Sequence, residues 1–297
     1  MERRLIEPQH MVLPQVLQVR GNYGLVYTDQ SYLPRRKSSV SLIENIGSAK
    51  TYSGKITSSS AKRIRKTVSC FIQKSKKRTI FNTVTNKSQV FQVSFLTLTI
   101  PDLTTNNNSF YYKRLLKPFL RILKERYQLK EYIWKAELQK RGSIHYHLTL
   151  NEFIPITSIK NEWNKLLQKE NLMSSYIRDF NNVSPNSVDI HSVKDVENIE
   201  AYLCKYISKI ETGKQALIGK VWGCSESLQG IKYFSETVVY ELESRIMKLV
   251  DSGKVVLKHF DNFKILRFTG KVNWSLFGTI FYNGYNEWRY NQPVLRL

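Results

Sequence analysis

Long apolar runs are missing from this sequence of 297 residues, and the longest, such as residues 95–100, is far too short to cross a bilayer. The start, Met1-Glu2-Arg3-Arg4, is not followed by an apolar signal region. Cysteine is also scarce, and Cys70, Cys204 and Cys224 form no CxxC pair, which argues against a zinc site and a disulfide framework. We therefore expect no membrane partner, and a reducing cytoplasm as the simplest location.

Acidic residues are absent between residues 45 and 101, a stretch that holds eleven basic residues. Over the whole chain, 46 Lys and Arg face 24 Asp and Glu, which gives a formal net charge of +22. A field of this sign binds polyphosphates, because each neutralised phosphate releases counterions. Charge density alone favours a nucleic-acid partner, leaves open a solvated basic face or an anionic membrane surface, and says nothing about catalysis.

The periodicity of the middle of the chain predicts an α+β fold. From residue 89 onward the predicted order is β-α-β-β-α-β-α, the split βαβ plan with an antiparallel sheet. Alternation or apolar runs mark the strands and helical spacing marks the helices. The strands are expected at 89–100, 131–139, 144–150 and 187–193, and the helices at 111–127, 156–167 and 195–210.

Less regular segments flank this core. Residues 1 to about 58 are polar and weakly patterned, and they are typical of an extended arm or a loosely ordered cover. A short basic helix at 62–74 and a strand at 79–84 are expected next. Beyond residue 229 we expect a helix at 235–250, a hairpin of 255–260 with 263–268, and a packed aromatic layer at the end. The expected division is a basic arm at 1–79, a core domain at 80–228 and an accessory region at 229–297.

A hairpin is predicted around residues 140–142. If Gln139 pairs with Ser143, Glu137 lies directly opposite His145. Because side chains alternate between the two faces of a strand, one face of the hairpin is then polar and the other apolar. The polar face comprises Lys135, Glu137, Gln139, His145 and His147.

Glu137, His145 and His147 are candidate metal ligands. Two neutral imidazoles and one carboxylate with open coordination positions suit Mn²⁺ or Mg²⁺ in a catalytic role, and the same set would take other divalent ions. An isolated His-x-His is more often a pair of exposed strand histidines. The carboxylate in register, away from the core face, favours the metal site.

Two tyrosines, Tyr202 and Tyr206, are four residues apart on the predicted helix at 195–210, so their rings lie along one flank of it. Each is followed three residues later by a lysine, Lys205 or Lys209. A phenol is a poor nucleophile at its free pKa of about 10, and a nearby lysine or metal favours the phenolate. The tyrosines are therefore candidate nucleophiles, with half-buried packing residues as the alternative.

Three segments together resemble the motifs of the HUH endonucleases. The sequence Phe-Leu-Thr-Leu-Thr at 95–99 is similar to their first motif, and the segment 134–147, which ends in His145-Tyr146-His147, is similar to their second. Tyr202-x-x-Lys205-Tyr206 is similar to their third. The nearest branch is the rolling-circle replication initiators of bacterial plasmids and single-stranded DNA phages, of the Bacteroidetes type. The similarity covers roughly residues 80 to 228, including Val221-Trp222-Gly223-Cys224-Ser225.

The resemblance implies a site-specific single-strand DNA endonuclease and ligase. A tyrosine oxygen attacks the scissile phosphate, which leaves a 5′-phosphotyrosine link and a free 3′-OH, and the same site rejoins strands. Tyr202 ranks first as the nucleophile because it fits the Tyr-x-x-Lys pattern, and Tyr206 is its rival or its partner in a second cleavage. Lys205 would stabilise the phosphate or the phenolate. Thr97 and Thr99 would line the DNA groove.

The resemblance also implies cofactors and partners. Mn²⁺ or Mg²⁺ would be held by Glu137, His145 and His147, and the substrate would be single-stranded or hairpin origin DNA. A host polymerase would extend the 3′-OH in the bacterial cytoplasm. Since the sequence has no GxxxxGK[ST] loop, duplex opening would need a host helicase. The origin sequence, the nick site and the oligomeric state stay open.

Two other classes of function remain. A transposase or relaxase shares the chemistry, but relaxases usually carry the tyrosine before the histidine pair, and the small single-tyrosine transposases are much shorter chains. A non-catalytic binding module with an RRM-like sheet needs base-stacking aromatic rings on the open sheet face. The polar residues Glu137, His145 and His147 occupy that face instead.

Overall fold

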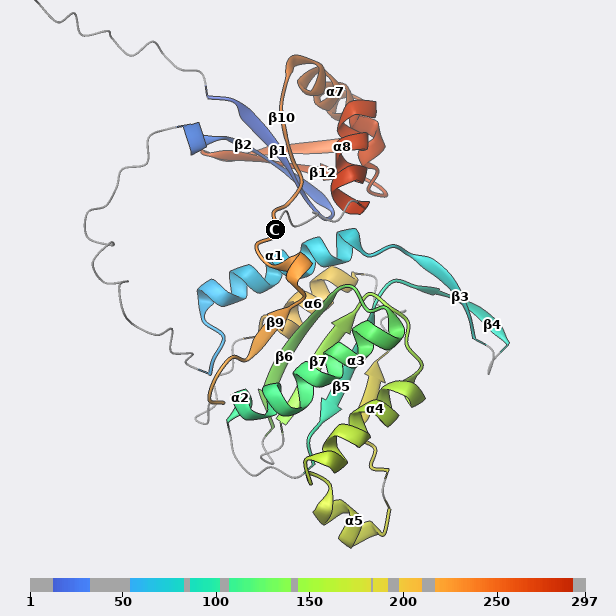
Figure 1. The fold of residues 1–297 in the computed structure, drawn as a ribbon. Coiled ribbons are helices and arrows are strands. Elements are labelled where there is room, and N and C mark those ends of the chain that lie inside the picture. The colour runs from blue at the N-terminus through green and yellow to red at the C-terminus, as the bar shows by residue number, and fades with distance from the viewer. Residues whose placement is uncertain are drawn as a thin grey trace, which may run out of the picture. The chain divides into compact units, whose positions relative to one another are not determined.

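The computed structural model describes residues 13–32, 54–82, 86–101, 107–139, 144–182, 184–191, 198–209 and 217–290. The chain divides into two compact units, Met1–Gly47 with Tyr233–Leu297, and Ser48–Lys232 (Figure 1). These boundaries differ from the expected ones at 79 and 228. The difference arises because strands near the N-terminus pair with strands near the C-terminus, while the helix at 58–74 packs within the second unit.

The second unit is built on a five-stranded sheet in the order β8-β5-β7-β6-β9, and every neighbouring pair is antiparallel. The order of elements along the chain from the first of these strands confirms the α+β class and the split βαβ plan. The strands are β5 (Ser94–Thr99), β6 (Tyr132–Leu138), β7 (Ile144–Leu150), β8 (Val188–His191) and β9 (Trp222–Cys224).

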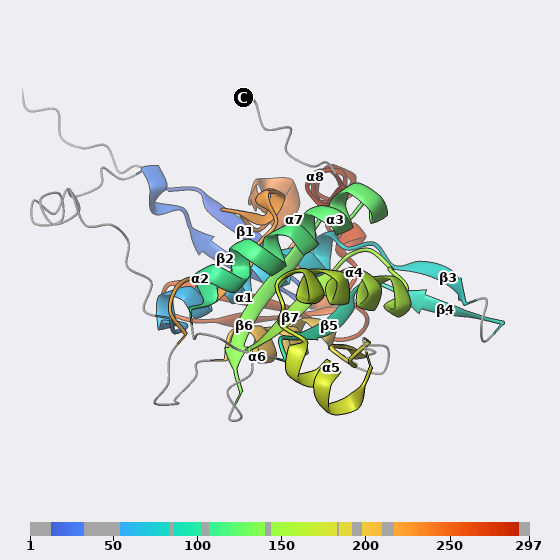
Figure 2. The same ribbon diagram turned by 60° about the horizontal axis from the view of Figure 1, so that its bottom comes forward.

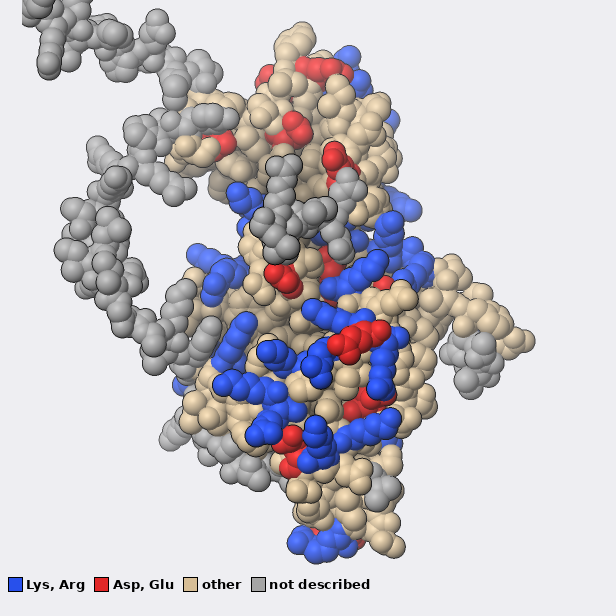
Figure 3. Space-filling view, viewed as in Figure 1, with Lys and Arg blue, Asp and Glu red and all other residues tan. Residues whose placement is uncertain are grey.

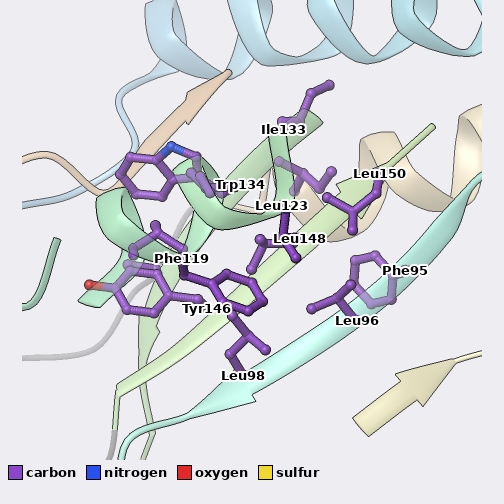
Figure 4. Packing of buried hydrophobic residues seen from close by; sticks show 14 of the residues in the cluster. Phe95, Leu96, Leu98, Phe119, Leu123, Ile133, Trp134, Tyr146, Leu148 and Leu150 are labelled. Atoms are coloured by element: carbon purple, nitrogen blue, oxygen red, sulfur yellow. The ribbon is translucent and has the colours of Figure 1, made fainter. Parts of the chain in front are cut away.

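Helices cover both faces of this sheet. On the apolar face, Trp134 and Tyr146 pack with Phe119 and Leu123 of α3 (Figure 4). On the polar face lies α6, whose neighbour is α1. The helices are α1 (Ser58–Lys74), α2 (Asn108–Tyr111), a π-helical turn (Tyr112–Leu116), α3 (Lys117–Tyr127), α4 (Ile156–Lys169), α5 (Ser174–Phe180) and α6 (Ile199–Ile207), with a 3₁₀ turn at Glu226–Leu228.

Helices α1 and α6 start at side-chain caps. The Thr57 hydroxyl accepts a hydrogen bond from the Ser60 amide at the start of α1, and the side-chain carbonyl of Asn198 does the same for the Ala201 amide at the start of α6. The basic helix expected at 62–74 is thereby confirmed and begins four residues earlier. The outer parts of the helix expected at 195–210 lie outside the described residues.

The strand expected at 89–100 is in fact two strands. β4 (Lys87–Phe91) pairs with β3 (Arg78–Asn82) in a separate hairpin that projects from the unit (Figures 1 and 2). The Gln92 side-chain amide donates to the carbonyls of Ile72 and Ser75, at 3.1 and 3.2 Å, so the break between β4 and β5 is held against the end of α1.

The first unit has its own sheet and core. Its sheet runs β10-β1-β2-β12-β11, and its core contains Trp274, Phe277, Phe281 and Tyr285, which confirms the packed aromatic layer. The elements are β1 (Gln15–Arg20), β2 (Tyr23–Thr28), β10 (Ser235–Thr237), α7 (Tyr240–Asp251), β11 (Val255–His259), β12 (Phe263–Phe268) and α8 (Thr279–Tyr290), with 3₁₀ turns at Gln30–Tyr32 and Trp274–Phe277.

Two expectations about the first unit were wrong. Residues 15–28 are a β-hairpin and not an extended arm, and residues 235–237 are a strand that pairs with β1, so the helix begins only at Tyr240. The expected hairpin of 255–260 with 263–268 is confirmed by β11 and β12. No helix within the described parts of the chain has the length and apolar character needed to cross a membrane.

Candidate active site

The predicted hairpin register is confirmed by the pairing of β6 with β7. Glu137 lies opposite His145 and Lys135 lies opposite His147. On the other side of β7, Thr99 lies opposite His145 and Thr97 opposite His147. Directly opposed residues in an antiparallel pair point to the same face of the sheet. The polar side chains of three strands are therefore gathered on one face.

His147 is held from three directions. Its Nε2 lies 3.2 Å from Glu137 Oε2, its Nδ1 lies 3.1 Å from Thr97 Oγ1, and its ring stacks on Phe95 with centroids 5.8 Å apart. The hydrogen bond from His147 is the main reason that the pKa of Glu137 falls to about 2, and the nearby ammonium of Lys135 lowers it further, against the effect of burial. Glu137 is therefore an ionised carboxylate at neutral pH.

His145 is oriented by two hydrogen bonds. Its Nδ1 lies 2.9 Å from the amide nitrogen of Gln139, and its Nε2 lies 3.2 Å from Thr99 Oγ1. Because an amide nitrogen can only donate, Nδ1 is the unprotonated nitrogen in this arrangement. Burial, together with the neighbouring His147, lowers the pKa of His145. The two threonines, expected to line a DNA groove, here contact the histidines.

The three candidate ligands share a face but do not converge on one point. Among the described residues, no group of three His, Cys, Asp or Glu side chains lies close enough together to hold a metal ion. The rings of His145 and His147 have centroids 6.3 Å apart, and His145 is turned toward Gln139. The chemistry of the donors still fits a divalent ion, because a carboxylate and two imidazoles are present and Glu137 already faces Nε2 of His147.

Helix α6 brings both tyrosines to the same place. The Tyr206 ring lies edge-on to the His147 ring, with centroids 5.9 Å apart, and the Tyr202 ring lies 5.4 Å from that of Tyr206. Both rings also pack edge-on against Phe95. Burial raises the pKa of Tyr202, and the neighbouring Tyr206 raises it further, so some other group must favour its phenolate. Lys205 is exposed on the same helix.

Lys135 is a residue whose role the sequence did not reveal. Its side chain is only 1% exposed, and its ammonium lies 3.8 Å from Glu137 Oε2 and 3.4 Å from the main-chain carbonyl of Lys209, which follows α6. A buried ammonium on the polar face therefore links the carboxylate to the end of the helix that carries the tyrosines. Its place opposite His147 was the available signal, and the contact with residue 209 is visible only in three dimensions.

The fold and this arrangement of side chains define an HUH-type site, with a His-x-His strand facing a tyrosine helix across an antiparallel sheet. Residues 93–211 match the model of a family of replication-associated proteins, the ORF2 family, which confirms the resemblance to the rolling-circle replication proteins over that segment. No curated protein and no solved structure matches the chain.

Proposed function

We propose that the protein is a rolling-circle replication initiator that nicks and rejoins single-stranded DNA at an origin through a 5′-phosphotyrosine intermediate. One observation carries the proposal: within the segment that matches a replication-associated family, the Tyr206 ring packs on His147, whose other side is bonded to the Glu137 carboxylate. A nucleophile and a candidate metal site thus lie side by side.

The proposed reaction is a transesterification at phosphorus. The phenol oxygen of a tyrosine on α6 forms a bond to the scissile phosphorus, the bond to the 3′-oxygen breaks, and the phenol proton ends on the departing 3′-oxygen by way of solvent or a base. One P–O bond replaces another, so no external energy source is needed. Attack by a 3′-OH on the phosphotyrosine reverses the reaction and rejoins the strands.

The residues of the polar face have separate proposed roles. A divalent ion, Mn²⁺ or Mg²⁺, held by Glu137, His145 and His147 would withdraw charge from the scissile phosphate. Thr97 and Gln139 fix the orientation of the two imidazoles. Such partners of ligands are usually as important to a metal site as the ligands themselves.

The two tyrosines are proposed to act in turn. Tyr202 fits the Tyr-x-x-Lys pattern with Lys205, which stabilises the developing phenolate or the phosphate, while the ring of Tyr206 contacts His147. One tyrosine would hold the first DNA end while the other cuts the regenerated junction. Their ring centroids are 5.4 Å apart, so both phenols are able to serve one metal site without movement of the helix.

The test is an incubation of the protein with labelled single-stranded oligonucleotides of randomised sequence and Mn²⁺. We expect a product with a free 3′-OH and a protein–DNA adduct that survives denaturation, and we expect EDTA to prevent both. Binding without cleavage would support a non-catalytic module instead, and cleavage that is unchanged by EDTA would exclude the metal site. Transfer of the captured strand into an unrelated DNA would favour a transposase.

A further inference from the structure

A cavity of about 500 Å³ lies in the second unit, apart from the residues of the candidate active site. One wall is the N-terminal half of α1 with the segment before it, and the opposite wall is strand β9 with the residues on either side of it. Its size falls in the ordinary range for small-molecule sites, about 300–1,000 Å³.

The cavity wall is strongly basic. Lys55, Arg63, Lys66 and Lys220 all line it, and the described residues of the lining include no Asp or Glu. Four cations around one small space repel each other unless an anion enters it. Hydroxyl groups are also present, because Thr57 and Ser60 line the same wall. The chemistry of the wall therefore fits a phosphate.

The same cavity contains an aromatic surface. Trp222, on β9, lines it and is partly buried, and the guanidinium carbon of Arg63 lies 5.8 Å from the centre of its ring. Nucleic-acid bases stack on such rings irrespective of sequence, and arginine planes often lie with them. A ring together with four cations is more than a phosphate alone requires.

The cavity is on the same face of the sheet as the candidate active site. Trp222 pairs with Lys135, and Lys135 pairs with His147, so the three side chains form one row across β9, β6 and β7. Neighbouring strands are about 4.8 Å apart, which puts Trp222 roughly 10 Å from His147. The buried Lys135 separates the two positions, so the cavity is a distinct site within reach of the same DNA strand.

We propose that this cavity binds one nucleotide of the single-stranded DNA substrate, with the base stacked on Trp222 and a phosphate held by Arg63 and the neighbouring lysines. Only an unpaired base is able to enter, because a base in a duplex has both faces covered. The inference rests on the proposed function for the identity of the ligand. It gives the protein a second point of contact that would fix the register of the strand at the scissile bond.

Binding of a labelled oligothymidylate to the full chain, followed by fluorescence anisotropy, tests the proposal. Trp222→Ala should weaken binding about tenfold, and Trp222→Phe should keep most of the affinity, because stacking needs only a ring. Arg63→Gln should reduce the slope of log affinity against log salt by about 0.7, the value for one lost phosphate contact on a single strand. The control is Arg178→Gln on α5, whose arginine pairs with Asp179. It removes the same charge elsewhere and should change the affinity less than twofold.

Photo-crosslinking separates this proposal from the proposed function. An oligonucleotide that carries 5-iododeoxyuridine should crosslink to Trp222, as located by mass spectrometry, in the wild type and in a Tyr202→Phe/Tyr206→Phe double variant. Crosslinks elsewhere, with normal covalent capture, would overturn the cavity and leave the nicking intact. Crosslinks at Trp222 without any capture would support the cavity and oppose the nicking. Equal protection of Trp222 by free thymidine monophosphate and by the oligonucleotide would assign the cavity to a free nucleotide and overturn the DNA assignment.

Discussion

At the scale of single residues, the polar face of the second unit is organised around His147, which contacts Glu137, Thr97, Phe95 and Tyr206. The sequence predicted the positions of Glu137, His145 and His147, because alternation along two strands and a short turn fix which residues are opposite each other. The orientation of each imidazole was not predictable. It depends on partners on β5 and beside the turn that periodicity does not specify.

His147→Ala should reduce metal-dependent nicking by more than about 100-fold, because loss of even a partner of a metal ligand commonly costs 10- to 100-fold. The measurement is the rate of oligonucleotide cleavage at several Mn²⁺ concentrations. The matched control is His259→Ala, which removes an exposed strand histidine from β11 of the other unit and should leave the rate unchanged. Equal rates for the two variants would remove His147 from the site.

Lys135→Met should destabilise the second unit by about 1–3 kcal/mol, because the Lys209 carbonyl loses its donor and Glu137 loses a buried cation. Thermal unfolding followed by circular dichroism measures this change. Lys209→Ala is the control, since the main-chain carbonyl that accepts the hydrogen bond is still present. An unchanged melting temperature for Lys135→Met would show that the contact does not stabilise the end of α6.

At the scale of elements, predictability follows the distance in sequence between interacting partners. Hairpins such as 255–260 with 263–268 were predicted because both strands and the turn are local. The strand at 235–237 was taken for helix because its partner is β1, more than two hundred residues earlier. The division of 89–100 into β4 and β5 likewise depends on Gln92 and its contacts with the end of α1. The cavity beside Trp222 escaped prediction for the same reason.

Helix α6 positions both tyrosines, so its N-terminal cap is expected to affect catalysis. Asn198→Ala removes the acceptor for the Ala201 amide and should cost about 1 kcal/mol of stability, with reduced covalent capture of DNA. Asn273→Ala removes the equivalent cap of the 3₁₀ turn Trp274–Phe277 in the first unit and should leave capture unchanged. Capture assays at a temperature well below unfolding distinguish the two. A similar loss of capture in both variants would mean that global stability, and not the placement of α6, is responsible.

At the scale of the whole molecule, the excess of positive charge is spread beyond the candidate active site. Basic side chains gather over α3 and α4, on the opposite face of the sheet from the polar residues (Figure 3). Several of these cations already have acidic partners, such as Arg126 with Glu162 and Arg121 with Glu125. The net charge of +22 therefore describes a broad attraction for DNA, and the unpaired share of it decides the strength of binding.

Binding of single-stranded DNA should accordingly weaken steeply with salt. Contact with about five phosphates would give a slope of log affinity against log salt of roughly −3.5, at about 0.7 for each phosphate. Anisotropy titrations at several salt concentrations measure this slope, with an uncharged peptide nucleic acid of the same sequence as the control ligand. A slope near zero would mean that the basic residues are only a solvated surface.

The proposed chemistry is tested most directly by identifying the residue that becomes linked to DNA. Wild-type protein, Tyr202→Phe, Tyr206→Phe and the double variant are each incubated with a labelled library of single-stranded oligonucleotides and Mn²⁺, and any adduct is digested and located by mass spectrometry. The prediction is a 5′-phosphotyrosine on α6 in the wild type, no capture by Tyr202→Phe or the double variant, and capture without strand transfer by Tyr206→Phe. Full capture by Tyr202→Phe would transfer the first step to Tyr206. An adduct on neither tyrosine, or capture by the double variant, would contradict the proposal.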